Sequence, residues 1–234
     1  MMASGIIYLL ALVVYIYALK NEEASTVIPL FQLSPIISYV FGFIFLQEYL
    51  NFQQIVASLV VITGAVLISI DMRQAAWKFK LSVFLLMFLS SVLFSLNSLI
   101  FKITALQSSF WAGMFWQYVG TFIAGCALLL LSRQYRSKFL YVLRNHRLPA
   151  LSLIALTEGL TFVGRSLFSF ATLLAPLALV SVVGGLQPAF VFIYGVVLTI
   201  FFPGVSNEDI SRKALLQKFT AIGIIFVGTC LLVV

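Results

Sequence analysis

Eight apolar segments, separated by short polar stretches, run the length of the 234-residue chain. Most of them reach the ~20 residues that an α-helix needs to cross a hydrocarbon layer about 30 Å thick. Inside such a layer a helix satisfies its own backbone N–H and C=O groups, so each segment is predicted to be a helix. The pattern therefore predicts an all-α, polytopic transmembrane helix bundle of about eight helices. We expect these helices at residues 2–19, 25–46, 52–70, 81–101, 110–131, 149–173, 176–202 and 216–234.

The composition agrees with a membrane setting. Hydrophobic residues make up 62% of the chain and charged residues 9%, whereas soluble domains carry roughly 25% charged residues. The first segment has no Lys or Arg before it and no small-residue cleavage site after it, so we expect a membrane helix rather than a signal peptide. The sequence contains no phosphate-binding loop, catalytic Ser/His pair or metal-ligand spacing, so we expect no enzyme, no cofactor and no metal site.

Basic residues are distributed unevenly between the loops. Most of the 14 Lys and Arg residues lie in the first, third, fifth and seventh loops, with Lys102 in the fourth loop and Arg165 inside a helix as exceptions. By the positive-inside rule the odd-numbered loops face the cytoplasm, which puts both ends of this chain outside. The net charge of +7 is therefore a topology signal and an attraction to anionic headgroups, and we expect no nucleic acid partner.

The second part of the chain repeats the first in weak form. Several positions match at an offset of 153, and others at an offset of 164, with the shift absorbed by the polar stretch 203–215. The matched pairs include Pro35/Pro188 and Gly42/Gly195, then Gln53/Gln217, Ala57/Ala221, Gly64/Gly228 and Leu67/Leu231. Weak internal repeats in an apolar chain are typical of transporters whose two halves rock around a site between them.

Residues 25–70 resemble the closing part of an EamA-type domain of the drug/metabolite transporter superfamily. The matching features are Pro35 within a helix, Glu48 at the helix end, and a final helix that carries Gly64. The later stretch with Gln187-Pro188 and Gly228 resembles a second copy. The resemblance implies ten helices, five in each of two inverted halves, and a carrier for a small organic metabolite.

Compared with that pattern, the first half is incomplete. We divide the chain into residues 1–71, with three helices, and residues 79–234, with five. Comparison of the halves indicates that about 75 residues are absent upstream, enough for two helices of ~20 residues and their loops. Two features depart from the family. Phe201 stands where a second Glu48 would align. The distribution of basic residues also predicts that the termini lie outside, whereas the resemblance implies that they lie inside.

Two charged residues lie within one predicted helix. Glu158 is about nine residues into its segment, ~14 Å from the start at 1.5 Å per residue, and Arg165 is two turns further on. A charge at this depth costs several kcal/mol unless it is paired, neutralised or facing water. Glu158 is thus a candidate substrate or proton-coupling site, and Arg165 a candidate for attracting an anionic group or balancing Glu158. The alternative for both is an internal ion pair, or an arginine reaching the interface, that holds helices together.

The remaining candidates are uncharged groups in the membrane and one helix-end carboxylate. Proline frees a backbone carbonyl for a cavity, so the helices of Pro35 and Pro188 either line the pathway or merely kink for packing. Glu48 is either an interfacial cap or gate, as the resemblance implies, or a solvated charge. The further polar candidates for the substrate site, which can equally be hydrogen bonds between helices, are Gln32, Asn97, Gln117 and Gln187.

Taken together, these features predict a secondary-active carrier in the cell membrane, the inner or plasma membrane of a prokaryote. Its partners are the lipid bilayer and a small-molecule substrate, with a homodimer expected if Met1 is the native start. A finer hypothesis is that transport is coupled to protons through Glu158 and that the carrier exports its substrate. The alternative is a non-transporting truncated membrane protein or a scaffold subunit; a membrane-embedded lipid enzyme is disfavoured by the scattered acids and the single His.

Overall fold

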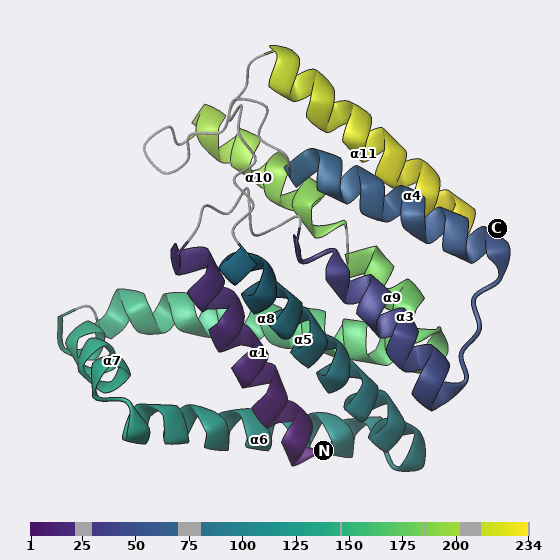
Figure 1. Ribbon diagram of the computed structural model, residues 1–234. Coiled ribbons are helices and arrows are strands. Elements are labelled where there is room, and N and C mark those ends of the chain that lie inside the picture. Colours follow the sequence, from purple (N-terminus) through teal and green to yellow (C-terminus); the bar gives the residue numbers. More distant parts are fainter. Residues whose placement is uncertain (22–29, 70–80, 146, 185, 202–211, 234) are drawn as a thin grey trace.

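The computed structural model describes residues 1–21, 30–69, 81–145, 147–184, 186–201 and 212–233. Within these residues the chain forms ten α-helices and no strand, which confirms the all-α bundle (Figure 1). Among the described helices, four are long and apolar enough to cross a membrane, in the ranges Met2–Lys20, Leu81–Gln107, Phe110–Leu131 and Leu151–Leu174. The helices are α1 (Met2–Asn21), α3 (Leu33–Leu46), α4 (Phe52–Ser69), α5 (Leu81–Gln107), α6 (Phe110–Leu131), α7 (Arg133–Asn145), α8 (Arg147–Leu174), α9 (Leu177–Gly184), α10 (Gln187–Phe201) and α11 (Arg212–Val233).

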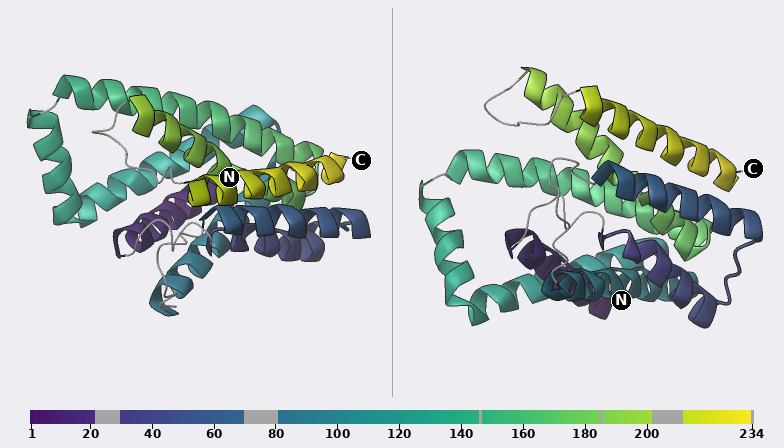
Figure 2. Two further views of the ribbon diagram at one scale, coloured as in Figure 1. Left: turned by 90° about the horizontal axis from the view of Figure 1, so that it is seen from above. Right: turned by 45° about the horizontal axis from the view of Figure 1, so that its top comes forward.

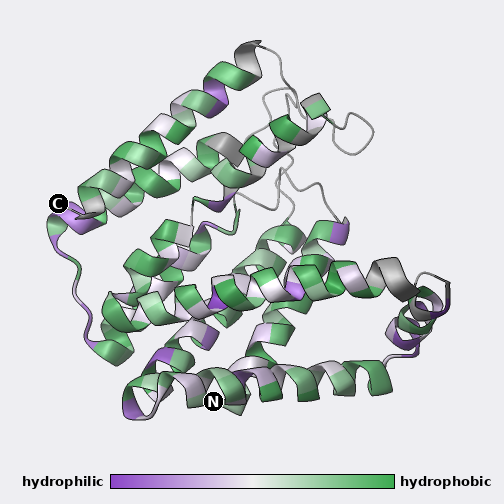
Figure 3. Cartoon of the chain, turned by 180° about the vertical axis from the view of Figure 1, so that it is seen from behind, coloured by the Kyte–Doolittle hydropathy of each residue, from purple (hydrophilic) through white to green (hydrophobic). Residues whose placement is uncertain are grey.

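Large apolar side chains cover the outside of the bundle. Figure 3 shows apolar residues along most of the helices. On α8, for example, Leu153, Leu160 and Leu167 each expose more than half of their surface. Such a surface is unfavourable in water and natural in lipid. The chain is therefore a multi-pass membrane protein.

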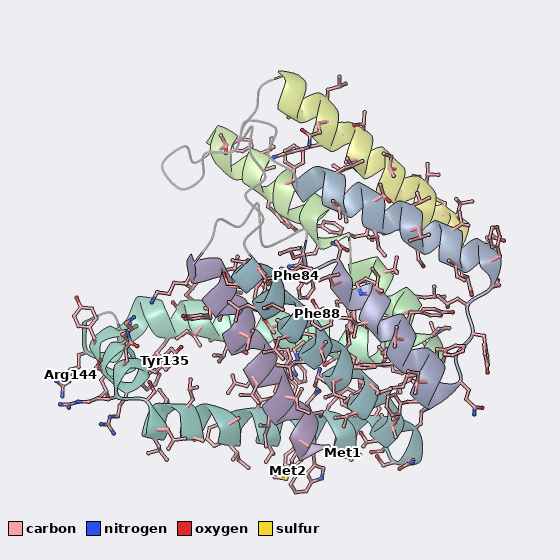
Figure 4. The ribbon with its side chains drawn as sticks, in the orientation of Figure 1. Met1, Met2, Phe84, Phe88, Tyr135 and Arg144 are labelled. Carbon is pink, nitrogen blue, oxygen red and sulfur yellow. The ribbon has the colours of Figure 1, made fainter. Side chains whose placement is uncertain are left out.

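The polar stretch 132–148, expected as a loop, contains the helix α7. Its apolar residues Tyr135, Phe139 and Val142 recur every three or four positions, and the basic residues Arg136, Lys138 and Arg144 lie at other positions of the helix. That spacing gives an amphipathic helix, which a search for apolar runs alone overlooks. The helix connects the ends of α6 and α8 (Figure 2), and Figure 4 places Tyr135 and Arg144 on it at the edge of the molecule.

The segment 176–202 was expected to form one continuous helix, and this expectation is wrong. Helix α9 ends at Gly184 and α10 begins at Gln187. Pro188 lies in the first turn of α10, where its missing N–H costs no helical hydrogen bond, and it cannot extend α9 because it cannot donate to a preceding carbonyl. Neither proline is therefore in the middle of a helix, because Pro35 likewise lies in the first turn of α3, after a turn at Phe31 and Gln32.

Helices α4 and α11 form an antiparallel pair (Figure 1). Two hydrogen bonds between them are related by the internal repeat. The Gln53 Nε2 donates to the Leu231 carbonyl at 3.1 Å, and the Gln217 Nε2 donates to the Leu67 carbonyl at 2.9 Å. These two bonds are interchanged by the offset of 164 found in the sequence. The repeated positions thus face one another, as expected for halves related by a two-fold axis. The boundaries 1–71 and 79–234 stay a prediction.

Helix α1 packs in the angle between α5 and α6. A side chain at Gly5 would lie 1.9 Å from the Gln117 carbonyl oxygen, and one at Gly120 would lie 2.1 Å from the Met2 carbonyl oxygen. Only glycine permits backbones this close. Helix α8, which aligns with α1 in the repeat, is in contrast exposed over most of its length.

Candidate functional site

A cavity of about 300 Å³ lies where the start of α3 and the α9–α10 break meet α5 and α8. Gln32 and Pro35 line it at the start of α3, and Gly184 and Gln187 line it at the α9–α10 break. Most of its wall is apolar, with aromatic rings from α1, α5, α8 and the turn before α3. Discontinuous membrane helices are typical of substrate sites in transporters because they bring backbone dipoles and polar side chains to a buried cavity.

Six of the eight predicted substrate-site or coupling residues line this cavity: Gln32, Pro35, Asn97, Gln117, Arg165 and Gln187. Glu158 does not line it and lies on an exposed stretch of α8. The side chain of Pro188 is outside what the structure describes, although its backbone lies in α10. The binding roles of all eight residues stay predictions.

Asn97 and Gln117 join two of the helices that form the cavity. The Gln117 Nε2 donates to the Asn97 Oδ1 at 2.8 Å, and Gln117 is almost fully buried. This hydrogen bond links α6 to α5, as the interhelical alternative predicted. It leaves the Asn97 amide NH2 as a remaining donor beside the cavity.

A group of serines, not anticipated from the sequence, forms a second polar contact between helices. The Ser38 Oγ donates to the Ser95 Oγ at 3.0 Å, and the Ser181 Oγ donates to the Ser38 Oγ at the same distance. The Ser95 Oγ in turn donates to the Ser34 carbonyl at 3.2 Å. The bonds connect α3, α5 and α9 on one side of the cavity. Serines spaced four apart, as Ser34 and Ser38 are, put hydroxyls on one helix face, and this was the available signal.

Among the described residues that line the cavity, Arg165 is the one charged residue. Its guanidinium carbon lies 3.6 Å from the centre of the Tyr8 ring and 4.8 Å from that of Tyr118. Its Nη2 atom is buried and has no hydrogen-bond partner in the described part of the chain. Glu158 forms no salt bridge with it, because seven residues place the two about 10 Å apart along the helix.

Glu48 and Lys102 form a salt bridge next to the cavity-lining residue Phe101. Lys102, expected in a loop, instead lies within α5, where it is 5% exposed. Its Nζ forms a short salt bridge with the Glu48 Oε1 and donates to the Ala175 carbonyl at 2.7 Å. The Glu48 Oε2 accepts from the Leu177 N–H at 2.7 Å. We call these four residues the lock; it joins α3, α5 and the α8–α9 turn, and Glu48 is therefore not a solvated charge.

The polar side chains of the cavity are suited to binding a solute. Among the described residues, no group of three or more His, Cys, Asp or Glu side chains could hold a metal ion; His146 lies outside them. The polar groups at the cavity are amides, hydroxyls and one guanidinium. Such groups orient a solute and stabilise its charge.

Comparisons with known proteins agree with the membrane fold. A crystal structure described only as that of a protein matches with a TM-score of 0.67 at 16% identity, covering 98% of this chain and 73% of that chain. This likeness shows the fold alone. A comparison with curated proteins gives no significant match. Residues 1–70 match the EamA-like transporter family, so the EamA-type resemblance of the first part of the chain is confirmed and a membrane transporter function is supported.

Proposed function

We propose that the protein is a secondary-active carrier that moves a small organic metabolite across the membrane by alternating access. The observation that carries this proposal is the cavity between the start of α3 and the α9–α10 break, with the lock next to it. The cavity residue Phe101 directly precedes Lys102 on α5, and the cavity residue Thr172 is three residues before Ala175 of the α8–α9 turn, so the lock lies next to the cavity.

The lock joins the ends of helices that belong to the even-numbered loops. By the positive-inside rule this end faces outward. A salt bridge that ties three helix ends can serve as an outer gate, because separating its charges inside a membrane is costly and rejoining them is favourable. Opening the lock would expose the cavity to the outside, and closing it would leave the cytoplasmic side as the route.

The test is the accessibility of a cysteine placed in the cavity wall. In a background with Cys126 and Cys230 changed to Ser, Ser98→Cys puts a thiol beside the cavity. In vesicles, a membrane-impermeant maleimide should label this cysteine from either face, because the carrier alternates. Lys102→Met should raise the labelling rate from the outer face and lower it from the inner face, since it removes the cation of the lock.

Ser137→Cys, on the exposed helix α7, is the matched control and should be labelled from one face only. Labelling of Ser98→Cys from a single face, unchanged by Lys102→Met, would contradict a carrier and favour the non-transporting scaffold.

Proton-coupled export through Glu158 is the finer part of the proposal. Glu158 lies outside the cavity wall, so coupling would act through the movement of α8 rather than by contact with the solute. Glu158→Gln should abolish any dependence of transport on a pH gradient while leaving exchange intact. Unchanged coupling in that variant would end the idea.

A further inference from the structure

We infer that the cavity selects small organic anions, and that Arg165 is the residue that binds their negative group. This inference rests on the proposed function, since it names the class of solute that the same cavity holds. It begins from the charge of the cavity wall. The described acidic residues are Glu48, which pairs with Lys102 in the lock, and Glu158, which lies outside the wall. Arg165 therefore gives the described wall a net positive charge.

The surroundings of Arg165 hold its charge without neutralising it. Tyr8 and Tyr118 present ring faces at 3.6 and 4.8 Å from the guanidinium carbon. Aromatic faces attract a cation but accept no strong hydrogen bond in the guanidinium plane. The five N–H donors of the guanidinium therefore keep their capacity for a carboxylate or similar anion, which they match in bidentate geometry.

Two polar atoms of the stacked pair Arg165 and Tyr118 are buried without partners. They are the Arg165 Nη2 and the Tyr118 Oη, and neither has a hydrogen-bond partner in the described part of the chain. Buried donors in proteins are almost always satisfied, and Arg165 lines the cavity, so its unsatisfied Nη2 atom indicates a ligand group.

The helix ends around the cavity do not reverse this charge. The N-termini of α3 and α10 each carry about half a positive charge, and the C-terminus of α9 carries about half a negative charge. These partial charges sum to about half a positive charge, which has the same sign as the charge of Arg165.

The body of the anion faces an apolar and aromatic wall. Phe94 lies between Tyr8 and Phe31 in edge-to-face contacts, with ring centres 5.8 and 5.7 Å apart. Tyr8, Phe31 and Phe94 all line the cavity. A flat apolar body held by rings and an anionic end held by Arg165 is the solute that suits a wall of this kind.

The test compares three probes with one skeleton and different charges: 3-phenylpropionate, 3-phenylpropan-1-ol and 3-phenylpropylamine. Isothermal titration of the whole chain in detergent should show that the carboxylate binds at least about tenfold more tightly than the alcohol or the amine. Arg165→Gln should bring the carboxylate down to the affinity of the alcohol, and Arg165→Lys should fall between. Arg133→Gln, on exposed α7, is the matched control and should bind like the unchanged protein.

Size-exclusion profiles and melting curves identify variants that fail to fold, and Arg165→Lys keeps the test open if Arg165→Gln does. Equal affinity for the three probes, preference for the amine, or no binding of the carboxylate overturns the inference. A folded Arg165→Gln protein with unchanged affinity also overturns it and makes Arg165 a packing residue. Because titration needs no transport, selective binding without alternating labelling at Ser98→Cys would end the carrier proposal and leave the anion site standing.

Discussion

Lys102 illustrates how a single charge is kept inside this bundle. A lysine that is 5% exposed in a membrane helix is stable only with partners, and its ammonium has the Glu48 carboxylate and the Ala175 carbonyl. Lys102→Met leaves the carboxylate with only the Leu177 N–H, so we expect a loss of stability on the order of 3 kcal/mol. Thermal or denaturant unfolding in detergent measures the loss.

A double-mutant cycle separates the ion pair from the packing of the lysine stem. Glu48→Gln with Lys102→Met should be less destabilising than the sum of the two single changes, because no unpaired charge then remains. The coupling free energy should exceed about 1 kcal/mol. Additive effects would show that the two side chains contribute independently and that the lock is not an energetic unit.

Glycine positions decide how closely the helices α4 and α11 approach. A methyl group on Gly64 would lie 2.6 Å from the Ile225 Cγ1, and one on Gly228 would lie 2.7 Å from the Val61 Cγ2. These contacts are interchanged by the repeat offset of 164. Gly64→Ala and Gly228→Ala should therefore destabilise the fold to a similar extent, roughly 1–3 kcal/mol each, through overpacking.

Gly223→Ala on α11 is the matched control, because a methyl group there would meet nothing within 4 Å. Its melting temperature should stay within experimental error of the unchanged protein. Strongly unequal effects of Gly64→Ala and Gly228→Ala would contradict the symmetric packing of the two helices.

The elements of this fold differ in how far the sequence predicts them. Apolar runs predicted the long helices because lipid requires about 20 apolar residues in succession. The repeated Gln53 and Gln217 were visible as a spacing, and their hydrogen bonds follow from it. The amphipathic helix α7 was missed because it contains no long apolar run. The α9–α10 interruption was missed because it lies inside a continuous apolar run.

The site was predictable in part for a similar reason. Polar residues inside apolar segments are rare, so Asn97, Gln117 and Arg165 could be singled out one by one. The partner of Glu48 could not, because Lys102 is 54 residues away and only the folded bundle brings them together. Pairwise contacts between helices depend on rotation and crossing angle, which apolar periodicity does not fix.

For the molecule as a whole, the function proposed for the lock depends on the orientation of the bundle in the membrane. The salt bridge ties the ends of α3 and α5 to the α8–α9 turn, on the side opposite the basic helix α7 in the order of crossings. If basic residues mark the cytoplasm, as the positive-inside rule states, the lock closes the outer end of the cavity. Reversal of the bundle would turn the same salt bridge into a cytoplasmic gate and reverse the predicted effect of Lys102→Met on labelling.

Single cysteines on the two sides decide between these orientations. In the background without Cys126 and Cys230, Ser137→Cys lies on exposed α7 and Ser108→Cys lies exposed in the α5–α6 turn. In intact cells an impermeant maleimide should label the Ser108→Cys protein and spare the Ser137→Cys protein, which should react only after permeabilisation. The opposite pattern would mean that the basic loops are outside. The attraction of α7 for anionic headgroups would then not determine the topology. Labelling of both in intact cells would mean that the chain inserts in two orientations, and the lock would then serve as an outer gate in only one of them.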